Sequence, residues 1–179
     1  MRLFIGIGLP SPVSEVLAQA ARTLIAPEAH LRARITWTRP ENMHVTISFL
    51  GQVEPSRLDD IQQSLATIRT APLHLQLNGF GSFANAGILY AQVKPSTRLL
   101  GFAEQVFESM QACGFPREQR PYSPHITLAR SKERFRVISR KVDDSAFRQA
   151  FEAHEFRLYE SFTSPQGSHY EVRRAFPLI

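Results

Sequence analysis

Cysteine is almost absent from this sequence of 179 residues, because Cys113 is the only one. A single thiol excludes an internal disulfide and a zinc cluster built from several thiolates, so we expect a reducing, cytoplasmic location. Long apolar runs are also missing, and the start MRLFIGIGLPSP has no charged segment followed by a long apolar stretch. These features predict a soluble protein that is neither exported nor inserted in a membrane.

Lysine is scarce as well, since Lys94, Lys132 and Lys141 are the only ones and all other basic residues are arginine. Basic residues nevertheless outnumber acidic ones by 21 to 16, which gives a formal net charge of +5. This surplus favours a polyanionic partner such as nucleic acid or a phosphorylated nucleotide. Arginine suits bidentate phosphate contacts, although a preference for arginine over lysine is equally typical of a GC-rich genome.

The hydrophobic content of 43% is sufficient for one folded domain over residues 1–179. Patterns rich in alternating, β-branched or aromatic residues predict strands at 2–8, 35–38, 44–50, 73–78, 89–93, 125–130, 156–162 and 169–176. Helical patterns predict helices over 11–25, from Pro55, from the Ser96 cap and over 143–151, with a basic loop at 131–141. The element order looks like two related halves and predicts an α+β fold with largely antiparallel sheets.

One motif occurs once in each half of the chain. The segment Arg39–Ile47 reads RPENMHVTI and the segment Arg120–Leu128 reads RPYSPHITL, so both follow R-P-x-x-x-H-h-T-h, where h is apolar. Because side chains alternate along a strand, His and Thr of each copy share one face and the apolar residues share the other. If the halves pack about a pseudo-two-fold axis, two imidazoles and two hydroxyls meet in one cleft.

That arrangement suits a phosphate. In-line displacement at phosphorus places the attacking and leaving oxygens on opposite sides, so removing one proton and donating another requires two separate groups. Histidine has a pKa near 6.5, so one ring can be a neutral base while the other is a protonated acid. Thr46 and Thr127 can bind non-bridging oxygens, and this chemistry needs no metal or other cofactor.

Two simpler interpretations compete with a catalytic site. A single His-x-Thr on a strand is usually only a polar strand face, but its duplication favours a shared site. A metal centre with His44 and His125 as ligands would need a third ligand, and none stands at helical or strand spacing from either histidine.

These residues resemble the two-histidine (2H) phosphoesterase superfamily, and within it the RNA 2',3'-cyclic phosphodiesterases, also called 2'-5' RNA ligases. The similarity runs from MRLFIGIGLP through WTRPENMHVTISFLG to RPYSPHITLAR. It implies a bilobal, pseudo-two-fold α+β fold whose two sheets, flanked by helices, enclose a central cleft. It also implies metal-independent opening of RNA 2',3'-cyclic phosphate ends to 2'-phosphates, with reversible, ATP-independent 2'-5' ligation, by a chain that we expect to be a monomer.

The resemblance assigns His44 and His125 as catalytic residues and Thr46, Thr127 and Arg130 as substrate-binding residues. We expect His125 to take a proton from water while protonated His44 donates one to the departing 3'-oxygen. In the family the residue at position 47 is often leucine, and isoleucine is a conservative departure from it.

For the remaining candidates near the motifs, the question is whether their side chains point into the cleft. Regular pleating would aim Arg130 away from the cleft, because it alternates with Ile126 and Leu128, so it can reach a phosphate only if the strand ends or bulges at Ala129. Phe49 has the same difficulty relative to His44 and is expected in the core. Tyr122 and Trp37 are the better aromatic candidates for substrate contact, and we list Tyr122 as substrate-binding. His30, His74, His154 and His169 are expected to be ordinary surface or hydrogen-bonded histidines.

Two other functions fit the same residues. The first is a cyclic phosphodiesterase for small nucleotides, such as a cyclic phosphate of ADP-ribose, which would use the same His and Thr residues. The second is a non-catalytic module that binds RNA ends, for which the positive charge and exposed arginines would be sufficient.

Overall fold

A computed structural model describes residues 1–24, 35–131, 144–164 and 167–179. The described strands are β1 (Arg2–Gly8), β2 (Ile35–Trp37), β3 (His44–Gln52), β4 (Leu73–Phe83), β5 (Ile88–Val93), β6 (His125–Ser131), β7 (Ala150–Ala153), β8 (Glu155–Ser164) and β9 (Gly167–Pro177). The α-helices are α1 (Ser11–Thr23), α3 (Leu58–Leu65) and α4 (Thr97–Ala112), and 3-10 turns are η1 (Pro40–Asn42), η2 (Pro55–Arg57), η3 (Ala84–Ala86) and η4 (Asp144–Arg148). The predicted α+β class is confirmed.

The strands are hydrogen-bonded in the order β7-β4-β5-β6-β3-β1-β8-β9, and β2 pairs with β6. Each of these pairs is antiparallel. The two halves of this order meet where β3 pairs with β6, and Val45 opposite Ile126 is the pair recorded there in the described chain. The two sequence motifs therefore lie on neighbouring strands at the junction between the halves.

The helices follow their sequence patterns closely. Helix α1 begins with Pro12 in its first turn, and Val13, Leu17 and Ala21 form its buried stripe. The Ser96 side chain caps α4 by accepting a hydrogen bond from the Leu99 amide at 3.2 Å. Gly114 follows α4 with φ +85°, a conformation that favours glycine and ends the helix.

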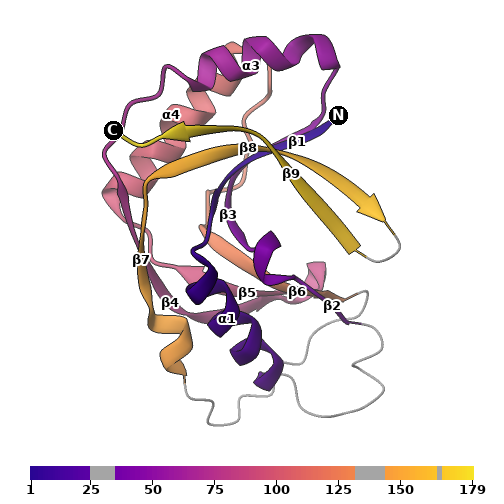
Figure 1. Cartoon of the computed structure of the whole chain (residues 1–179), viewed down its shortest axis with the longest axis vertical. Coiled ribbons are helices and arrows are strands. Elements are labelled where there is room, and N and C mark those ends of the chain that lie inside the picture. The colour runs from indigo at the N-terminus through magenta and orange to yellow at the C-terminus, as the bar shows by residue number, and fades with distance from the viewer. Residues whose placement is uncertain (25–34, 132–143, 165–166) are drawn as a thin grey trace.

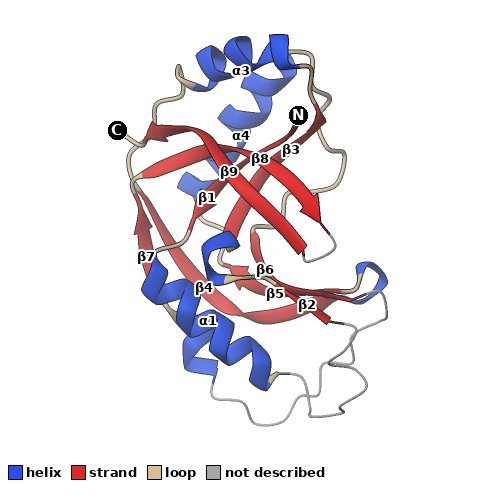
Figure 2. Ribbon diagram, turned by 45° about the vertical axis from the view of Figure 1, so that its right-hand side comes forward, coloured by secondary structure: helices blue, strands red, loops and turns tan. Residues whose placement is uncertain are grey.

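The helix that precedes each motif packs against strands from the other half of the chain. Helix α1 precedes the first motif but contacts β6 and η4, and α4 precedes the second motif but contacts β3. Figures 1 and 2 show α1 beside β4 and β5 at the bottom of the molecule, while α3 and α4 cover the upper strands. This exchange places apolar cover on one side of both motif strands and leaves the opposite side for the motif side chains.

Two predicted elements differ from the structure. The helix expected over 143–151 is the 3-10 turn η4, and the chain then enters β7 at Ala150, where Phe151 and Ala153 are buried by pairing with β4. The helix from Pro55 starts as the 3-10 turn η2 and becomes α-helical at Leu58. Most of the expected basic loop at 131–141 lies outside the described residues. No helix among the described residues is long and apolar enough to cross a bilayer.

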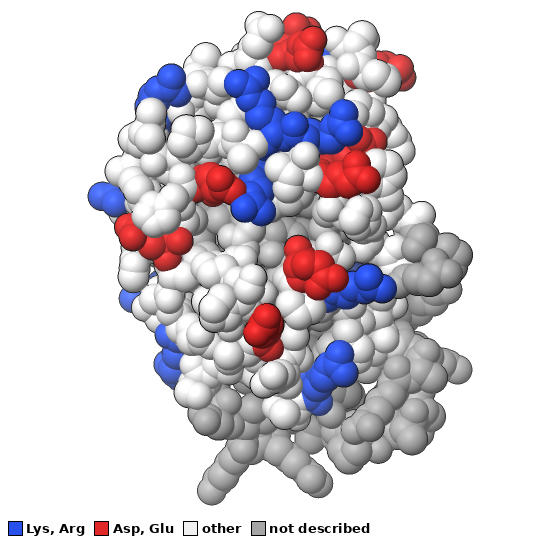
Figure 3. All heavy atoms as spheres, in the orientation of Figure 1, with Lys and Arg blue, Asp and Glu red and all other residues white. Residues whose placement is uncertain are grey.

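The described Lys and Arg residues do not form a single basic patch on the face seen in Figure 1. Figure 3 shows Lys and Arg groups on the upper half of this face next to Asp and Glu groups. Pairing of this kind occurs on β8 and β9, where Arg157 lies 2.5 Å from Glu155 and Arg173 lies 3.6 Å from Glu160. Binding of a phosphate therefore depends on individual basic residues and not on a broad basic surface on this face.

Candidate active site

The two motif histidines are held in the same way at the start of their strands. The Nδ1 atom of His44 lies 2.7 Å from the Asn42 carbonyl oxygen, and Nδ1 of His125 lies 2.7 Å from the Ser123 carbonyl oxygen. Because a carbonyl can only accept, each Nδ1 carries the proton and donates it. In the neutral form of each ring, Nε2 is therefore the basic nitrogen.

The pairing of Val45 with Ile126 brings the two motifs side by side. Both residues are fully buried, so the flanking His and Thr residues of each strand lie on the opposite face. Antiparallel strands run in opposite directions from this pair, so His44 lies toward the Thr127 side of it and Thr46 toward the His125 side. The described structure thus brings together the four motif residues that the sequence singled out.

His44 is packed among aromatic rings. Its ring centroid lies 4.6 Å from that of Phe4, 5.3 Å from Tyr170 and 5.8 Å from Tyr159. Gly6 makes room for the ring, because a Cβ at residue 6 would lie 3.0 Å from the Val45 carbonyl oxygen and 3.3 Å from His44 Cδ2. Burial lowers the pKa of His44 to about 4, against the hydrogen bond to Asn42, which raises it.

His125 has a similar but more open environment. Its ring meets Phe83 and Tyr90 edge-on, with centroid distances of 5.1 Å and 5.5 Å. Phe83 and Tyr90 stack on each other at 4.3 Å, and Gly81 leaves space for this stack, because a Cβ there would lie 2.6 Å from the Tyr90 hydroxyl. Burial lowers the pKa of His125 as well, partly offset by its hydrogen bond to Ser123.

Electrostatic coupling shows that the charged groups share one site. The positive charge of Arg130 lowers the pKa of both histidines, and a charge on His125 lowers the pKa of His44 further. Burial is the larger cause in both rings. Two imidazoles and a guanidinium within mutual electrostatic reach form a site suited to an anion.

Arg130 reaches this site because of a β-bulge. Tyr90 pairs with Thr127 but its neighbour Leu89 pairs with Ala129, so Leu128 is an extra residue in β6. The alternation shifts by one after this bulge, and Arg130 faces the same side as Thr127. The condition that the sequence set for Arg130, a bulge near Ala129, is therefore met, and Arg130 faces the side of the cleft that regular pleating would have denied it.

Phe49 is displaced in the same manner. Gly6 pairs with Thr46 and Ile5 with Ser48, so Ile47 is an extra residue in β3 and Phe49 faces the side of Thr46. Its side chain is 67% exposed and its ring lies 5.9 Å from that of Phe4. The expectation of a core Phe49 is wrong. Phe49 and Arg130 each stand five residues after a motif histidine, so comparing the two copies could have identified both.

Tyr122 and Trp37 make different contacts from those expected of a substrate platform. The Tyr122 hydroxyl donates a hydrogen bond to the Thr46 carbonyl oxygen at 3.1 Å, its ring meets Phe107 edge-on, and burial raises its pKa. This hydroxyl is thus bonded to the strand of the first motif. Trp37 pairs in register with the buried Ala129, and the Arg22 guanidinium lies 5.8 Å from its ring centroid.

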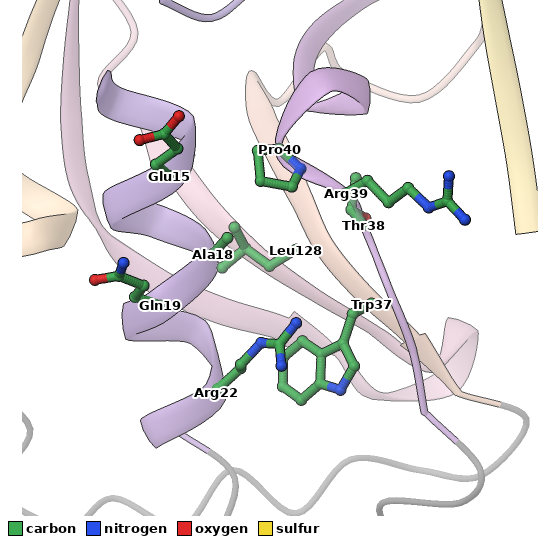
Figure 4. Close-up of a pocket in the computed structure, with 9 residues that line it drawn as sticks. All are labelled: Glu15, Ala18, Gln19, Arg22, Trp37, Thr38, Arg39, Pro40 and Leu128. Carbon is green, nitrogen blue, oxygen red and sulfur yellow. The ribbon is translucent and has the colours of Figure 1, made fainter. Parts of the chain in front are cut away.

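Trp37 lines a cavity of about 450 Å³ between α1 and the segment that leads into η1. Figure 4 shows Glu15, Gln19 and Arg22 of α1 on one side and Trp37 on the other. Leu128 forms part of the wall, and its side chain lies on the face of β6 opposite to Thr127. This cavity is therefore separated from the motif histidines by β6.

The other histidines that the structure describes form no comparable group. His154 and His169 are exposed and lie 3.6 Å and 3.7 Å from Glu152 and Glu171 on their own strands. His30 lies outside the described residues. Within the described residues, no group of three or more His, Cys, Asp or Glu side chains is placed to hold a metal ion.

Comparison with known proteins agrees with this geometry. The model of the family described as LigT like Phosphoesterase matches residues 7–90 and 92–170, which include both motifs. The chain belongs to the LigT-like phosphoesterase family. The resemblance to the 2H phosphoesterases is thereby confirmed.

Curated relatives match this LigT-like chain along nearly its whole length. The RNA 2',3'-cyclic phosphodiesterase of Methanocaldococcus jannaschii is 30% identical, with 96% of this chain and 98% of the relative covered. The protein of the same name from Archaeoglobus fulgidus is 28% identical, with 98% and 99% covered. The structure of Escherichia coli LigT with 3'-AMP has a TM-score of 0.84 at 24% identity and covers 99% of this chain and 97% of that one, which shows the shared fold.

Proposed function

We propose that this protein opens RNA 2',3'-cyclic phosphate ends without a metal ion and leaves a 2'-phosphate. The observation that carries the proposal is the placement of two imidazoles, each held through Nδ1 by a backbone carbonyl, on two neighbouring strands that each carry a threonine on the same face. The curated relatives named RNA 2',3'-cyclic phosphodiesterase support the same reaction class. We assign this work to the cytoplasm, in line with the single cysteine.

In this mechanism a phosphate lies between the two Nε2 atoms. Nε2 of His125 takes a proton from water as the water oxygen attacks phosphorus, and the bond from phosphorus to the 3'-oxygen breaks. Nε2 of His44 donates its proton to that oxygen, so the products are a 3'-hydroxyl and a 2'-phosphate. The protonated and neutral rings exchange their states during the reaction and must be reset through water.

The burial of His44 sets a condition on its role as the acid. With a pKa near 4, the ring is mostly neutral at pH 7 unless a negative charge stands beside it. The phosphate of the substrate supplies such a charge, so substrate binding promotes protonation of His44. Thr46 and Thr127 donate to the non-bridging oxygens, and Arg130 stabilises the developing negative charge.

Ligation uses the same groups. A 5'-hydroxyl takes the place of water, its oxygen bonds to phosphorus as the bond from phosphorus to the 3'-oxygen breaks, and the products are a 2'-5' linkage and a 3'-hydroxyl. His125 deprotonates the 5'-hydroxyl and His44 protonates the 3'-oxygen, and the two histidines swap these roles when the 3'-hydroxyl attacks the linkage in the reverse reaction. No ATP is required, because the strained cyclic ester already carries the activated phosphorus.

The exposed ring of Phe49 favours a nucleotide end over a bare phosphate. A base that stacks on Phe49 would keep its ribose near Thr46, since both side chains face the same side of β3. The same platform would serve a small cyclic nucleotide, so turnover of mononucleotide and oligonucleotide cyclic phosphates must be compared. Higher kcat/KM for the oligonucleotide supports an RNA end as the substrate, whereas a preference for the mononucleotide supports the small-nucleotide alternative.

The test of the proposal is incubation of the protein with an RNA that ends in a 2',3'-cyclic phosphate, in the presence of EDTA. We expect conversion to the 2'-phosphate at the rate seen without chelator. Loss of activity with EDTA would support a metal-dependent reaction instead. Binding of the RNA with no product formed would support a non-catalytic module for RNA ends.

A further inference from the structure

The two motif histidines differ in one connection to the rest of the molecule. Asn42, whose carbonyl oxygen accepts from His44, also donates from its side-chain Nδ2 to the Ser168 carbonyl oxygen at 2.8 Å. Ser123 stands at the equivalent place before His125, and its hydroxyl has no hydrogen bond to any described residue. Among the described residues, this position therefore connects the first motif, and not the second, to a distant strand.

Ser168 lies near the start of β9, which pairs with β8 over its whole length to form the β8–β9 ribbon (Glu155–Ser164 with Gly167–Pro177). Figures 1 and 2 show this ribbon reaching from the upper part of the molecule toward the side where β2 and β6 lie. At the end of the ribbon where β8 leads into β9, a Cβ on Gly167 would lie 4.0 Å from Thr36 of β2. The ribbon therefore extends across the junction that carries the two motifs.

The ribbon also covers the His44 ring. Tyr170 stands two residues beyond Ser168, and its ring meets His44 edge-on at 5.3 Å and Phe4 edge-on at 5.0 Å. Tyr159, from β8, stacks on Phe4 at 4.8 Å. Because Ser168 and Tyr170 are on one strand, a bond that holds Ser168 also limits how far Tyr170 can move from His44.

We propose that Asn42 is a positioning residue that latches the β8–β9 ribbon over His44, fixing the orientation of the ring and keeping water from it. Asn42 then acts on the His44 ring in two ways, through its backbone carbonyl and through its side-chain amide. The carbonyl fixes Nδ1 and the amide holds the aromatic cover in place. The effect of the latch on turnover rests on the proposed function, whereas its effect on the ring does not.

Other groups that face His44 must be accounted for in a test based on protonation. Arg130 and His125 face it from β6, and Tyr159 and Tyr170 face it from β8 and β9. Removing the Asn42 amide leaves all four groups in the chain. A change in the protonation of His44 in that variant therefore reports on its exposure to water and on the distance of these groups.

The experiment follows each histidine by NMR during a pH titration, using protein labelled at the imidazole carbons, without substrate. In Asn42→Ala and in Asn42→Ser, which copies Ser123 of the second motif, we expect the pKa of His44 to rise toward its usual value of about 6.5 while that of His125 stays in place. With a cyclic-phosphate RNA, kcat is expected to fall about 10- to 100-fold and KM to change much less, because the ring is misplaced.

The matched control is Glu171→Gln. Glu171 is exposed, lies 3.7 Å from His169 and stands next to Tyr170 on the same strand, so by alternation it faces away from the side of Tyr170 and His44. His44 and turnover should therefore be unaffected. If His44 titrates as in the wild type in both Asn42 variants, the latch does not exist. If His44 shifts but the wild type does not open cyclic phosphates, the latch stands and the proposed function is wrong.

Discussion

The phenolic hydroxyl of Tyr122 donates a hydrogen bond to the backbone carbonyl oxygen of Thr46, over 3.1 Å. Tyr122 precedes the second motif histidine and Thr46 belongs to the first motif, so this bond ties the two halves together at the site. It adds to the pairing of Val45 with Ile126, the ladder pair recorded between β3 and β6 in the described chain. Both contacts therefore help to set the separation of the two imidazoles.

Replacing Tyr122 with phenylalanine should lower both stability and turnover. The variant keeps the ring against Phe107 but leaves the Thr46 carbonyl without this donor, which should cost about 1 kcal/mol of unfolding free energy. Turnover should fall further than this loss explains, because the two strands can shift relative to each other. Urea unfolding together with kcat measures both effects. An unchanged midpoint and an unchanged kcat would show that the hydroxyl does not tie the halves.

The buried neutral His44 should make the protein sensitive to acid. Its pKa is about 4 in the folded protein and near 6.5 in the unfolded chain, so the unfolded chain binds the proton more readily between these values. The stabilisation is present above pH 6.5 and is lost as the pH falls toward 4, by about 3 kcal/mol in total. Unfolding at pH 7.0 and 4.5 should show a smaller difference for His44→Gln than for the wild type. Equal differences would contradict a buried neutral ring.

Arg130 should matter for catalysis, and an arginine on the far side of β6 should not. In Arg130→Ala we expect kcat/KM to fall about 10²-fold, because a cation beside the phosphate is lost. The pKa of both histidines should also rise, because the charge that lowers it is removed. The acid limb of the pH profile should move to higher pH. The matched control is Arg22→Ala, which removes an equal charge from the cavity beside Trp37. Equal losses in the two variants would show that general charge is responsible.

Phe49 should contribute to substrate binding and little to folding. Phe49→Ala is expected to raise KM for a cyclic-phosphate RNA several-fold, by about 1 kcal/mol of lost stacking, and Phe49→Tyr to retain binding. Stability should change by less than about 0.5 kcal/mol, because the side chain is 67% exposed. Steady-state kinetics and thermal unfolding of the three proteins test this. A large loss of stability with KM unchanged would place Phe49 in a structural role.

The sequence predicts most strands and the shared face of His and Thr, because short-range alternation determines both, but it misses β7, where it predicts a helix. For example, the strand expected at 2–8 is β1, from Arg2 to Gly8. Alternation fails beyond the two bulges, at Phe49 and Arg130, since the position of a bulge depends on how the partner strand pairs. The sequence of one strand alone does not show where a bulge lies. In β6 the bulge coincides with two consecutive buried residues, Leu128 and Ala129.

Long-range contacts were beyond prediction for a related reason. The bond from Tyr122 to Thr46 joins residues far apart in the sequence, and so does the bond from Asn42 to Ser168. The identity of a tyrosine or an asparagine does not indicate which distant residue it bonds to. The sequence around Tyr122 is the same whether its side chain stacks on a base or donates a hydrogen bond to a neighbouring strand. The register of β3 against β6 decides between these roles.

Joint action of both imidazoles on one phosphate is tested most directly by single-turnover opening of a 2',3'-cyclic-phosphate RNA end by His44→Ala, His125→Ala and the double variant. We predict a loss of at least about 10²-fold in rate for each single variant, with the double variant little slower than either, as expected of groups that act as a unit. A single variant that keeps nearly full activity would contradict the claim.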